Sequence, residues 1–270
     1  MTRERPNRPT THLEVISKEW LTPDMLRLVV GGPNFPAFVD NGFADAYVKI
    51  VFDHEGRPYP EPVNVSALKA ELPSDQWPKT RTYTVRSVDH DKQEVAIDFV
   101  IHGDEGLAAP WAVAAEPGDL IQFMGPGGAW SPVEDADFHV FVGDESAVPA
   151  IAAGLERLPE DAVGAVVLEA SEHMLEISSP AGVSIDWFVR GEAAYDPDAL
   201  SKRVRALDLA RREGQVAVFA HGEREAMKGL RRVFNELEIP RERLSISGYW
   251  ANGRVEDVFQ AEKRTDIGKV

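Results

Sequence analysis

The pattern of hydrophobic residues changes near residue 130, and this change limits the possible folds more than any other feature. Before it, short segments rich in β-branched and aromatic residues are separated by turns such as Thr22-Pro23-Asp24 and Gly31-Gly32-Pro33. Such segments, with frequent turns, are typical of a small antiparallel barrel or sandwich. Six strands are expected, at Leu13–Ile16, Met25–Val30, Tyr47–Phe52, Arg81–Arg86, Val95–Val100 and Asp119–Met124.

After Pro132, short apolar strands alternate with amphipathic helices. The expected strands are His139–Val142, Ala165–Leu168, Ser184–Val189, Val216–Ala220 and Leu244–Gly248, and the expected helices are Ser146–Leu158, Ala199–Ala210 and Glu223–Glu238. This alternation predicts a parallel sheet with crossover helices. We therefore expect a two-domain α+β protein, with a six-stranded antiparallel β-barrel over residues 12–132 and an α/β domain over residues 137–270.

Charge and composition exclude several classes of protein. Lysine and arginine total 29 against 45 aspartate and glutamate residues, a net charge of −16. A surface with this negative charge disfavours binding to nucleic acids and to anionic bilayers. No apolar run approaches the ~20 residues of a membrane span, so we expect no membrane insertion. The N-terminal sequence MTRERPNRPT lacks the apolar core of a secretory signal, and we expect a cytoplasmic protein.

Several kinds of catalytic centre are also disfavoured. The chain has no cysteine, which excludes disulfides, thiolate chemistry and an iron–sulfur cluster held by its own ligands. Its histidines are not spaced as ligand pairs, so no metal site is expected. Neither a phosphate-binding loop nor the G-x-S-x-G turn of many hydrolases occurs.

The expected strand Arg81–Arg86 carries residue types that suit a flavin dinucleotide. Alternation places Arg81 and Tyr83 on one face and Thr84 on the other. Arginine offers a fork of donors to a pyrophosphate, and tyrosine offers a flat surface to a ring system. Threonine can hydrogen-bond the edge of that ring. The same residues also fit an ordinary edge strand with exposed arginines.

A second segment runs from the strand end at Val100 through His102 to Gly106-Leu107-Ala108-Ala109. Small residues before a helix let the backbone approach a ligand closely, and free N–H groups at a helix start favour an anion. His102 has an equally simple alternative, a hydrogen bond to the local backbone.

Three glycine-containing segments follow. Gly125–Gly128 ends a strand and fits a hairpin loop. Gly143–Ala147 joins a strand to a helix where an α/β sheet binds nucleotides. Tyr249 and Trp250 follow the last strand, where they either cover a ring system or belong to the core.

Taken together and in order, these motifs resemble the siderophore-interacting protein family. The matching segments are RTYTVR, DFVIHGDEGLAAPWA, GDESAVPAIAAGLE and GYW. The family consists of FAD-binding ferric-siderophore reductases within the ferredoxin–NADP reductase-like superfamily. The resemblance implies that residues 12–132 bind FAD and that residues 137–270 form an NAD(P)H-binding domain.

The resemblance also implies roles for individual residues. Arg81 would hold the FAD pyrophosphate, Tyr83 would pack on the isoalloxazine, and Thr84 would act as the catalytic residue beside its N5. The remaining cofactor contacts would come from Val100, His102, Gly106, Leu107, Ala108 and Ala109 on the ribityl and phosphate side, Asp144, Glu145 and Ala147 on the nicotinamide side, and Tyr249 and Trp250 near the ring.

One position departs from the family pattern. Many members follow G-Y-W with a basic residue, a contact for anionic ferric siderophores, but Ala251 stands here. Lys49 and Arg254 are therefore the candidate substrate-binding residues. Lys49 equally fits a solvated strand lysine.

The expected activity is FAD-dependent reduction of Fe(III) to Fe(II) in a siderophore, with NADH or NADPH as donor. Glu169 lies 26 residues after Gly143, a spacing that favours NADH, because an acidic residue there can bind a ribose hydroxyl. Ferredoxin is an alternative donor, although an acidic protein would repel an acidic ferredoxin. Two other functions stay open: a general NAD(P)H–flavin oxidoreductase with another acceptor, and a non-catalytic siderophore-binding protein.

Overall fold

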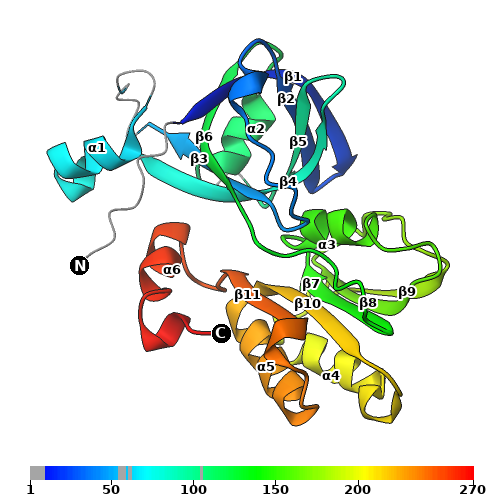
Figure 1. The fold of residues 1–270 in the computed structure, drawn as a ribbon. Helices are drawn as coiled ribbons and strands as arrows, with labels where there is room; N and C mark the ends of the chain where they lie inside the picture. The colour runs from blue at the N-terminus through cyan, green and yellow to red at the C-terminus, as the bar shows by residue number, and fades with distance from the viewer. Residues whose placement is uncertain (1–9, 54–58, 60–62, 104–105) are drawn as a thin grey trace, which may run out of the picture. The chain divides into compact units, whose positions relative to one another are not determined.

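The computed structural model describes residues 10–53, 59, 63–103 and 106–270. The chain divides into two compact units, Met1–Ala129 and Trp130–Val270, and each is described here by itself (Figure 1). None of the helices within the described ranges is both long and apolar enough to cross a lipid bilayer.

The first unit is a closed antiparallel barrel in the order β1-β2-β5-β4-β3-β6. Its strands are β1 Thr11–Thr22, β2 Met25–Gly31, β3 Tyr47–Phe52, β4 Lys79–Asp89, β5 Glu94–Val100 and β6 Leu120–Gly127. The expected six-stranded barrel is thus confirmed, and the sandwich alternative is wrong. Alternation explains the interior, since Leu26, Leu28 and Val30 of β2 all point into the core, where Phe99 and Phe123 are fully buried.

Two short helices accompany the barrel: α1 Val65–Glu71 and α2 Ala108–Ala114. The Asn64 side chain caps α1 by accepting a hydrogen bond from the Ala67 amide at 3.0 Å. Val65 belongs to a small cluster that packs against Val51 and Met124, and this cluster anchors the excursion between β3 and β4.

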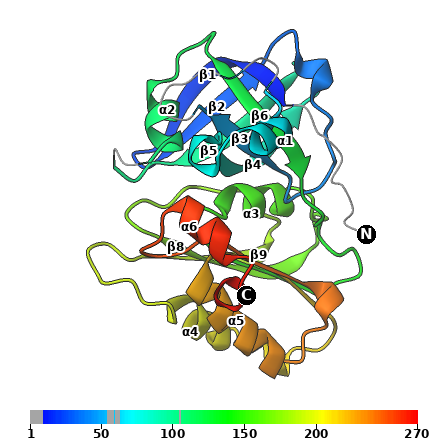
Figure 2. The ribbon, with the colours of Figure 1, turned by 90° about the vertical axis from the view of Figure 1, so that its left-hand side faces the viewer.

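The second unit is a parallel sheet in the order β11-β10-β7-β8-β9. Its strands are β7 Phe138–Asp144, β8 Val163–Ala170, β9 Gly182–Val189, β10 Val216–Glu223 and β11 Leu244–Trp250, and its helices are α3 Val148–Leu155, α4 Ala199–Ala206, α5 Arg224–Glu236 and α6 Glu256–Glu262. Helices α4 and α5 pack on one face of the sheet and α3 packs on the other (Figure 2). The predicted α/β domain is confirmed.

Several strands extend beyond their apolar stretches. β7 continues to Asp144 and β10 continues to Glu223, two and three residues past the expected ends at Val142 and Ala220. Pairing explains the extension, because His221 and Gly222 pair with Ser247 and Gly248 of β11. The extra residues bring polar side chains to the carboxyl edge of the sheet.

Candidate functional site

The ladder between β4 and β5 ends partway along β4. Among the described residues, these strands pair from Val85 with Ile97 to Asp89 with Glu94, and a register shift separates Val85 from Ser87. The earlier half of β4, Lys79–Thr84, pairs with β3 alone. We call the stretch where Arg81–Thr84 of β4 and Phe99–Val100 of β5 do not pair the β4–β5 seam.

Backbone geometry directs hydrogen-bonding groups into this seam. The Val85 N–H donates to the Ala46 carbonyl at 2.7 Å, so these residues form a hydrogen-bonded pair. Bonded and non-bonded pairs alternate along an antiparallel ladder. The Thr84 N–H therefore points away from β3 and toward β5, at the end of the β4–β5 ladder. Thr84 itself is buried, although Tyr83 and Val85 on either side of it face the barrel core.

Aromatic side chains line the seam. The Tyr83 ring lies 4.3 Å from the Phe99 ring between centroids, and Phe99 lies 6.2 Å from Trp111 of α2. Tyr83 is half-buried and packs against the barrel core. Arg81 precedes it on the same face of β4 and donates from Nη1 to the Thr80 carbonyl at 2.9 Å.

The start of α2 presents backbone next to this aromatic row. Gly106 has a φ of +94°, and a Cβ added there would meet nothing within 4 Å. Within the described residues no side chain caps α2, which starts after Leu107 with the buried residues Ala108 and Ala109. Val100 ends β5 half-buried, and His102 is exposed in the loop that follows. Residues 104 and 105 of the DFVIHGDEGLAAPWA segment lie outside the described residues.

These features fit a flavin dinucleotide. The seam offers an aromatic surface for a ring, while Arg81 and the start of α2 suit phosphates. The structure brings Arg81, Tyr83, Thr84 and the start of α2 into one region of the first unit.

In the second unit, buried carboxylates gather at the carboxyl edge of the sheet. Asp144 ends β7, Glu169 lies near the end of β8, and Glu223 ends β10; each is at most 5% exposed. Burial raises the pKa of Asp144 to about 6, against the opposing effect of its hydrogen bonds. Burial also raises the pKa of Glu169, although the Arg190 guanidinium opposes the shift.

Each of these carboxylates has specific partners. Asp144 accepts hydrogen bonds from the Trp250 indole at 2.9 Å and from the Glu223 amide at 2.7 Å. Glu223 accepts from the Tyr195 hydroxyl at 2.6 Å, and Glu169 accepts from Arg190 Nη1 at 2.7 Å.

The other predicted residues of this unit lie nearby. Glu145 accepts hydrogen bonds from the amide and hydroxyl of Ser171. Ala147 is fully buried, and its amide donates to the Asp144 carbonyl at 2.9 Å. Tyr249 meets His221 edge-on, with ring centroids 4.9 Å apart. Burial lowers the pKa of His221 to about 3, so this imidazole is neutral at physiological pH.

The two predicted substrate-binding residues belong to different units. Lys49 is half-buried on the outer face of β3, opposite Thr82 of β4, and no ion pair is found for it within the described part of the chain. The guanidinium of Arg254 donates to Glu262 of α6 at 3.0 Å, so part of its charge is neutralised.

The sequence interpretation missed four members of the carboxyl-edge network: Arg190, Tyr195, His221 and Glu223. His221 and Glu223 could have been found by extending the strand Val216–Ala220 to its polar end. Arg190 and Tyr195 have no comparable signal, because they come from the segment between β9 and α4.

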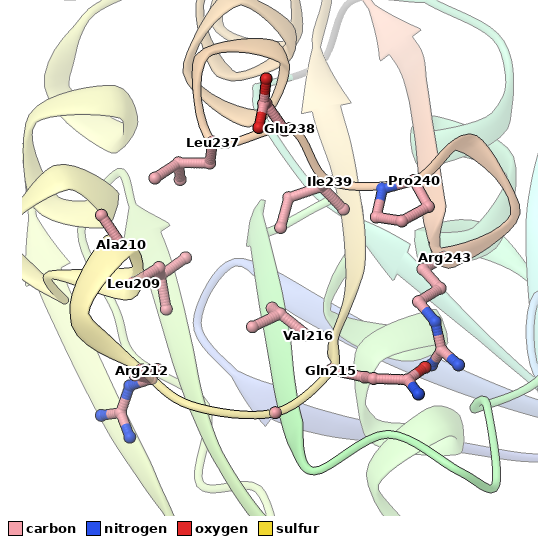
Figure 3. Close-up of a pocket in the computed structure, with 11 residues that line it drawn as sticks. Leu209, Ala210, Arg212, Gln215, Val216, Leu237, Glu238, Ile239, Pro240 and Arg243 are labelled. Atoms are coloured by element: carbon pink, nitrogen blue, oxygen red, sulfur yellow. The ribbon is translucent and has the colours of Figure 1, made fainter.

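A cavity of about 340 Å³ lies elsewhere in the second unit (Figure 3). Val216, the first residue of β10, lines it together with Leu237, Ile239 and Arg243. It therefore adjoins the amino end of a sheet strand, and none of the predicted site residues lines it.

The barrel with a flavin-type seam and the parallel α/β unit together define a flavin-dependent oxidoreductase of the ferredoxin–NADP reductase type. Comparison with known families agrees. Residues 14–130 match the siderophore-interacting FAD-binding domain, and residues 136–253 match the siderophore-interacting protein domain. The chain therefore belongs to the siderophore-interacting protein family, and the family predicted from the motifs is confirmed.

Individual relatives agree with this placement. Ferric vibriobactin reductase of Vibrio cholerae is 31% identical over 93% of both chains. The NADPH-dependent ferric-chelate reductase of Escherichia coli is 29% identical, over 88% of this chain and 91% of its own length. The crystal structure of the siderophore-interacting protein SipS from Aeromonas hydrophila has a TM-score of 0.77 and 29% identity, covering 96% of this chain and 98% of its own. A ferredoxin–NADP⁺ reductase from Plasmodium falciparum, 12% identical with a TM-score of 0.64 and covering 89% of this chain and 96% of its own, shares the fold.

Proposed function

We propose that this FAD-dependent oxidoreductase reduces ferric siderophores in the cytoplasm, with NADH or NADPH as electron donor. Residues 12–132 are proposed as the FAD-binding domain and residues 137–270 as the nicotinamide-binding domain. The observation that carries the proposal is the β4–β5 seam, where the pairing of β4 with β5 ends and the Tyr83 ring packs beside Phe99. The relatives named as ferric-siderophore or ferric-chelate reductases support the acceptor.

The chain's own residues would bind and orient the cofactor. Arg81 would neutralise the pyrophosphate together with the amides of Gly106–Ala109, while Val100 and His102 would border the ribityl side. Tyr83 would pack against the ring, and the Thr84 N–H and hydroxyl would bond its edge near N5. In the second unit, Asp144, Glu145, Ala147, Tyr249 and Trp250 would border the nicotinamide dinucleotide.

Bound FAD supplies the conversion of a two-electron donor into one-electron steps. One NAD(P)H gives NAD(P)⁺, a proton and two electrons, which reduce two ferric chelates. Siderophore oxygen ligands are hard and hold Fe(II) less tightly than Fe(III), so reduction releases the metal. The protein need not coordinate iron; it has to orient the chelate, and Lys49 and Arg254 are the proposed contacts.

The choice of a nicotinamide dinucleotide as electron donor is supported by the residues at the carboxyl edge of the second sheet. Glu169 forms an ion pair with Arg190 there, so the ribose of a bound dinucleotide would lie next to both a carboxylate and a guanidinium. The same carboxylates, with a net charge of −16, disfavour an acidic ferredoxin as donor.

An anaerobic assay tests the proposal. Protein loaded with FAD is mixed with NADH or NADPH, then with a ferric siderophore and a coloured ferrous trap. We expect the flavin absorbance to bleach and the trap to develop colour on addition of the siderophore. Bleaching without iron release would indicate a general flavin reductase. A protein that binds the ferric chelate without retaining flavin would indicate a binding protein.

A further inference from the structure

The carboxylate of Asp144 joins the ends of three neighbouring strands. From the end of β7, its Oδ2 accepts the Glu223 amide of β10 at 2.7 Å and the Trp250 indole of β11 at 2.9 Å. Its Oδ1 accepts the amide of Ser146 at 3.0 Å and the hydroxyl of the same residue at 2.5 Å. Four donors thus converge on one side chain that is 5% exposed.

The backbone of β10 is shaped to admit this carboxylate. Gly222 has a φ of +151°, and a Cβ added there would lie 2.6 Å from Asp144 Oδ2. That distance is far inside van der Waals contact, so a side chain at residue 222 would displace the carboxylate. The glycine lets one oxygen reach both the Glu223 amide and the Trp250 indole.

The same edge holds a second acid and aromatic pair. Glu223 accepts the Tyr195 hydroxyl at 2.6 Å, and the Tyr195 and Trp250 rings lie 6.4 Å apart between centroids. An indole has a single N–H donor, so its one acceptor limits the rotation of a half-buried ring. Asp144 is that acceptor for Trp250.

We propose that Asp144 is a positioning residue that holds the Trp250 indole in one orientation at the carboxyl edge of the sheet, and so keeps an aromatic wall ready for the dinucleotide. This inference rests on the proposed function, because it assigns a purpose to Trp250 within the proposed nicotinamide site. Asp144 acts through Trp250 and touches no reacting atom.

The charge on Asp144 controls the strength of this contact. A carboxylate accepts an indole hydrogen bond more strongly than a neutral acid does. A proton on Oδ2 of Asp144 would face the Glu223 amide and the Trp250 indole, which are both donors. A proton on Oδ1 would require the Ser146 hydroxyl to rotate and accept a hydrogen bond from it. The raised pKa of Asp144 places this change near pH 6. Among the described residues, the other ionisable groups of this edge are Glu145 in the following turn, Glu223 and the neutral His221 of β10, Glu169 of β8, and Arg190 and Tyr195 after β9.

The first test follows the indole N–H resonances of the full chain by NMR. The chain has six tryptophans, and Trp250→Phe identifies the relevant signal by its loss. We expect this signal to shift as pH falls through about 6 in the wild type, and Asp144→Asn to abolish the titration. Asp135→Asn, at an exposed carboxylate that pairs with Arg243, is the matched control and leaves the titration intact.

The second test measures the rate at which the donor reduces the flavin. We expect Asp144→Asn and Trp250→Phe each to slow reduction about tenfold, and the double variant to be no slower than Trp250→Phe alone. The rate of the Asp144→Asn protein should no longer change across pH 6.

Two results would overturn the inference: an indole signal that does not titrate in the wild type, or single-variant losses that multiply in the double variant. The wild-type titration needs no variant, so it decides the matter even if Asp144→Asn does not fold. Failure of both dinucleotides to reduce wild-type flavin would instead overturn the proposed function, because the indole signal reports the Asp144–Trp250 contact separately.

Discussion

Arg27 of β2 and Asp98 of β5 face each other in register and form a two-pronged ion pair. Arg27 Nε donates to Oδ1 of Asp98 at 2.6 Å, and Nη2 donates to Oδ2 at 2.7 Å. The Asp98 side chain is 1% exposed, so solvent does not replace these contacts. The pair joins β2 to β5 next to the β4–β5 seam, where β5 no longer pairs with β4.

Replacing Asp98 with alanine should therefore destabilise the barrel. Removing the carboxylate takes two charge-assisted hydrogen bonds from the Arg27 guanidinium, whose side chain is 24% exposed, and we expect the free energy of unfolding to fall by about 2 kcal/mol. Urea denaturation measures this loss. Asp186→Ala, which breaks the exposed pair with Arg203, should cost less than about 1 kcal/mol. Equal losses from the two substitutions would contradict this assignment.

Arg81→Ala should weaken flavin binding. A charge-assisted hydrogen bond is worth roughly 1.5–3 kcal/mol, which corresponds to a loss of about 10–100-fold in affinity. Titration of the flavin-free protein with FAD measures the dissociation constant. Thr82→Ala changes the neighbouring exposed residue of β4 and serves as the control. An unchanged dissociation constant for the arginine variant would remove Arg81 from the phosphate site.

Gly222→Ala should destabilise the second unit through a direct clash with Asp144. A positive φ alone costs of order 1–3 kcal/mol for a residue with a side chain, and the clash adds to it. Gly253→Ala is a control for a positive φ without a clash, since Gly253 has a φ of +70° and a Cβ there meets nothing within 4 Å. We expect chemical denaturation to show a larger loss for the Gly222 variant. Equal losses in the free energy of unfolding would mean that the Asp144 carboxylate moves aside without an energetic cost.

Stability should depend on pH through Asp144. Its pKa rises from 3.8 to about 6 on folding, so the folded chain keeps a proton that the unfolded chain has lost. The resulting stabilisation is complete below pH 3.8 and disappears as pH rises through about 6. When the pH rises from 5 to 7.5, we expect the free energy of unfolding of the wild type to fall by about 1 kcal/mol relative to that of Asp144→Asn. Parallel unfolding curves at the two pH values measure the difference, and a pH-independent difference would place the pKa of this carboxyl near its ordinary value.

The layer architecture was predictable from local patterns. Period-two segments such as Met25–Val30 predicted barrel strands, and alternating strands and helices predicted the parallel sheet, because hydrophobic periodicity reports directly which face is buried. The motif RTYTVR lies on β4, which borders the seam, and its arginine and tyrosine fall on one face.

The polar network at the carboxyl edge was less predictable. Hydrophobic periodicity stops at Ala220, whereas backbone pairing carries β10 on to Glu223. Likewise, Glu169 was predicted to face a ribose, and the structure pairs it with Arg190, a residue 21 positions later that no local pattern connects to it. Contacts between side chains from distant segments depend on tertiary packing, and that information is absent from short windows of sequence.

The early end of the β4–β5 ladder has a consequence for the protein before it acquires its cofactor. Backbone groups that lack a neighbouring strand are a template for pairing with another chain. Thr84 and Phe99, on the two sides of the seam, are both buried, so until flavin arrives the barrel's own side chains protect these backbone groups from pairing with another chain.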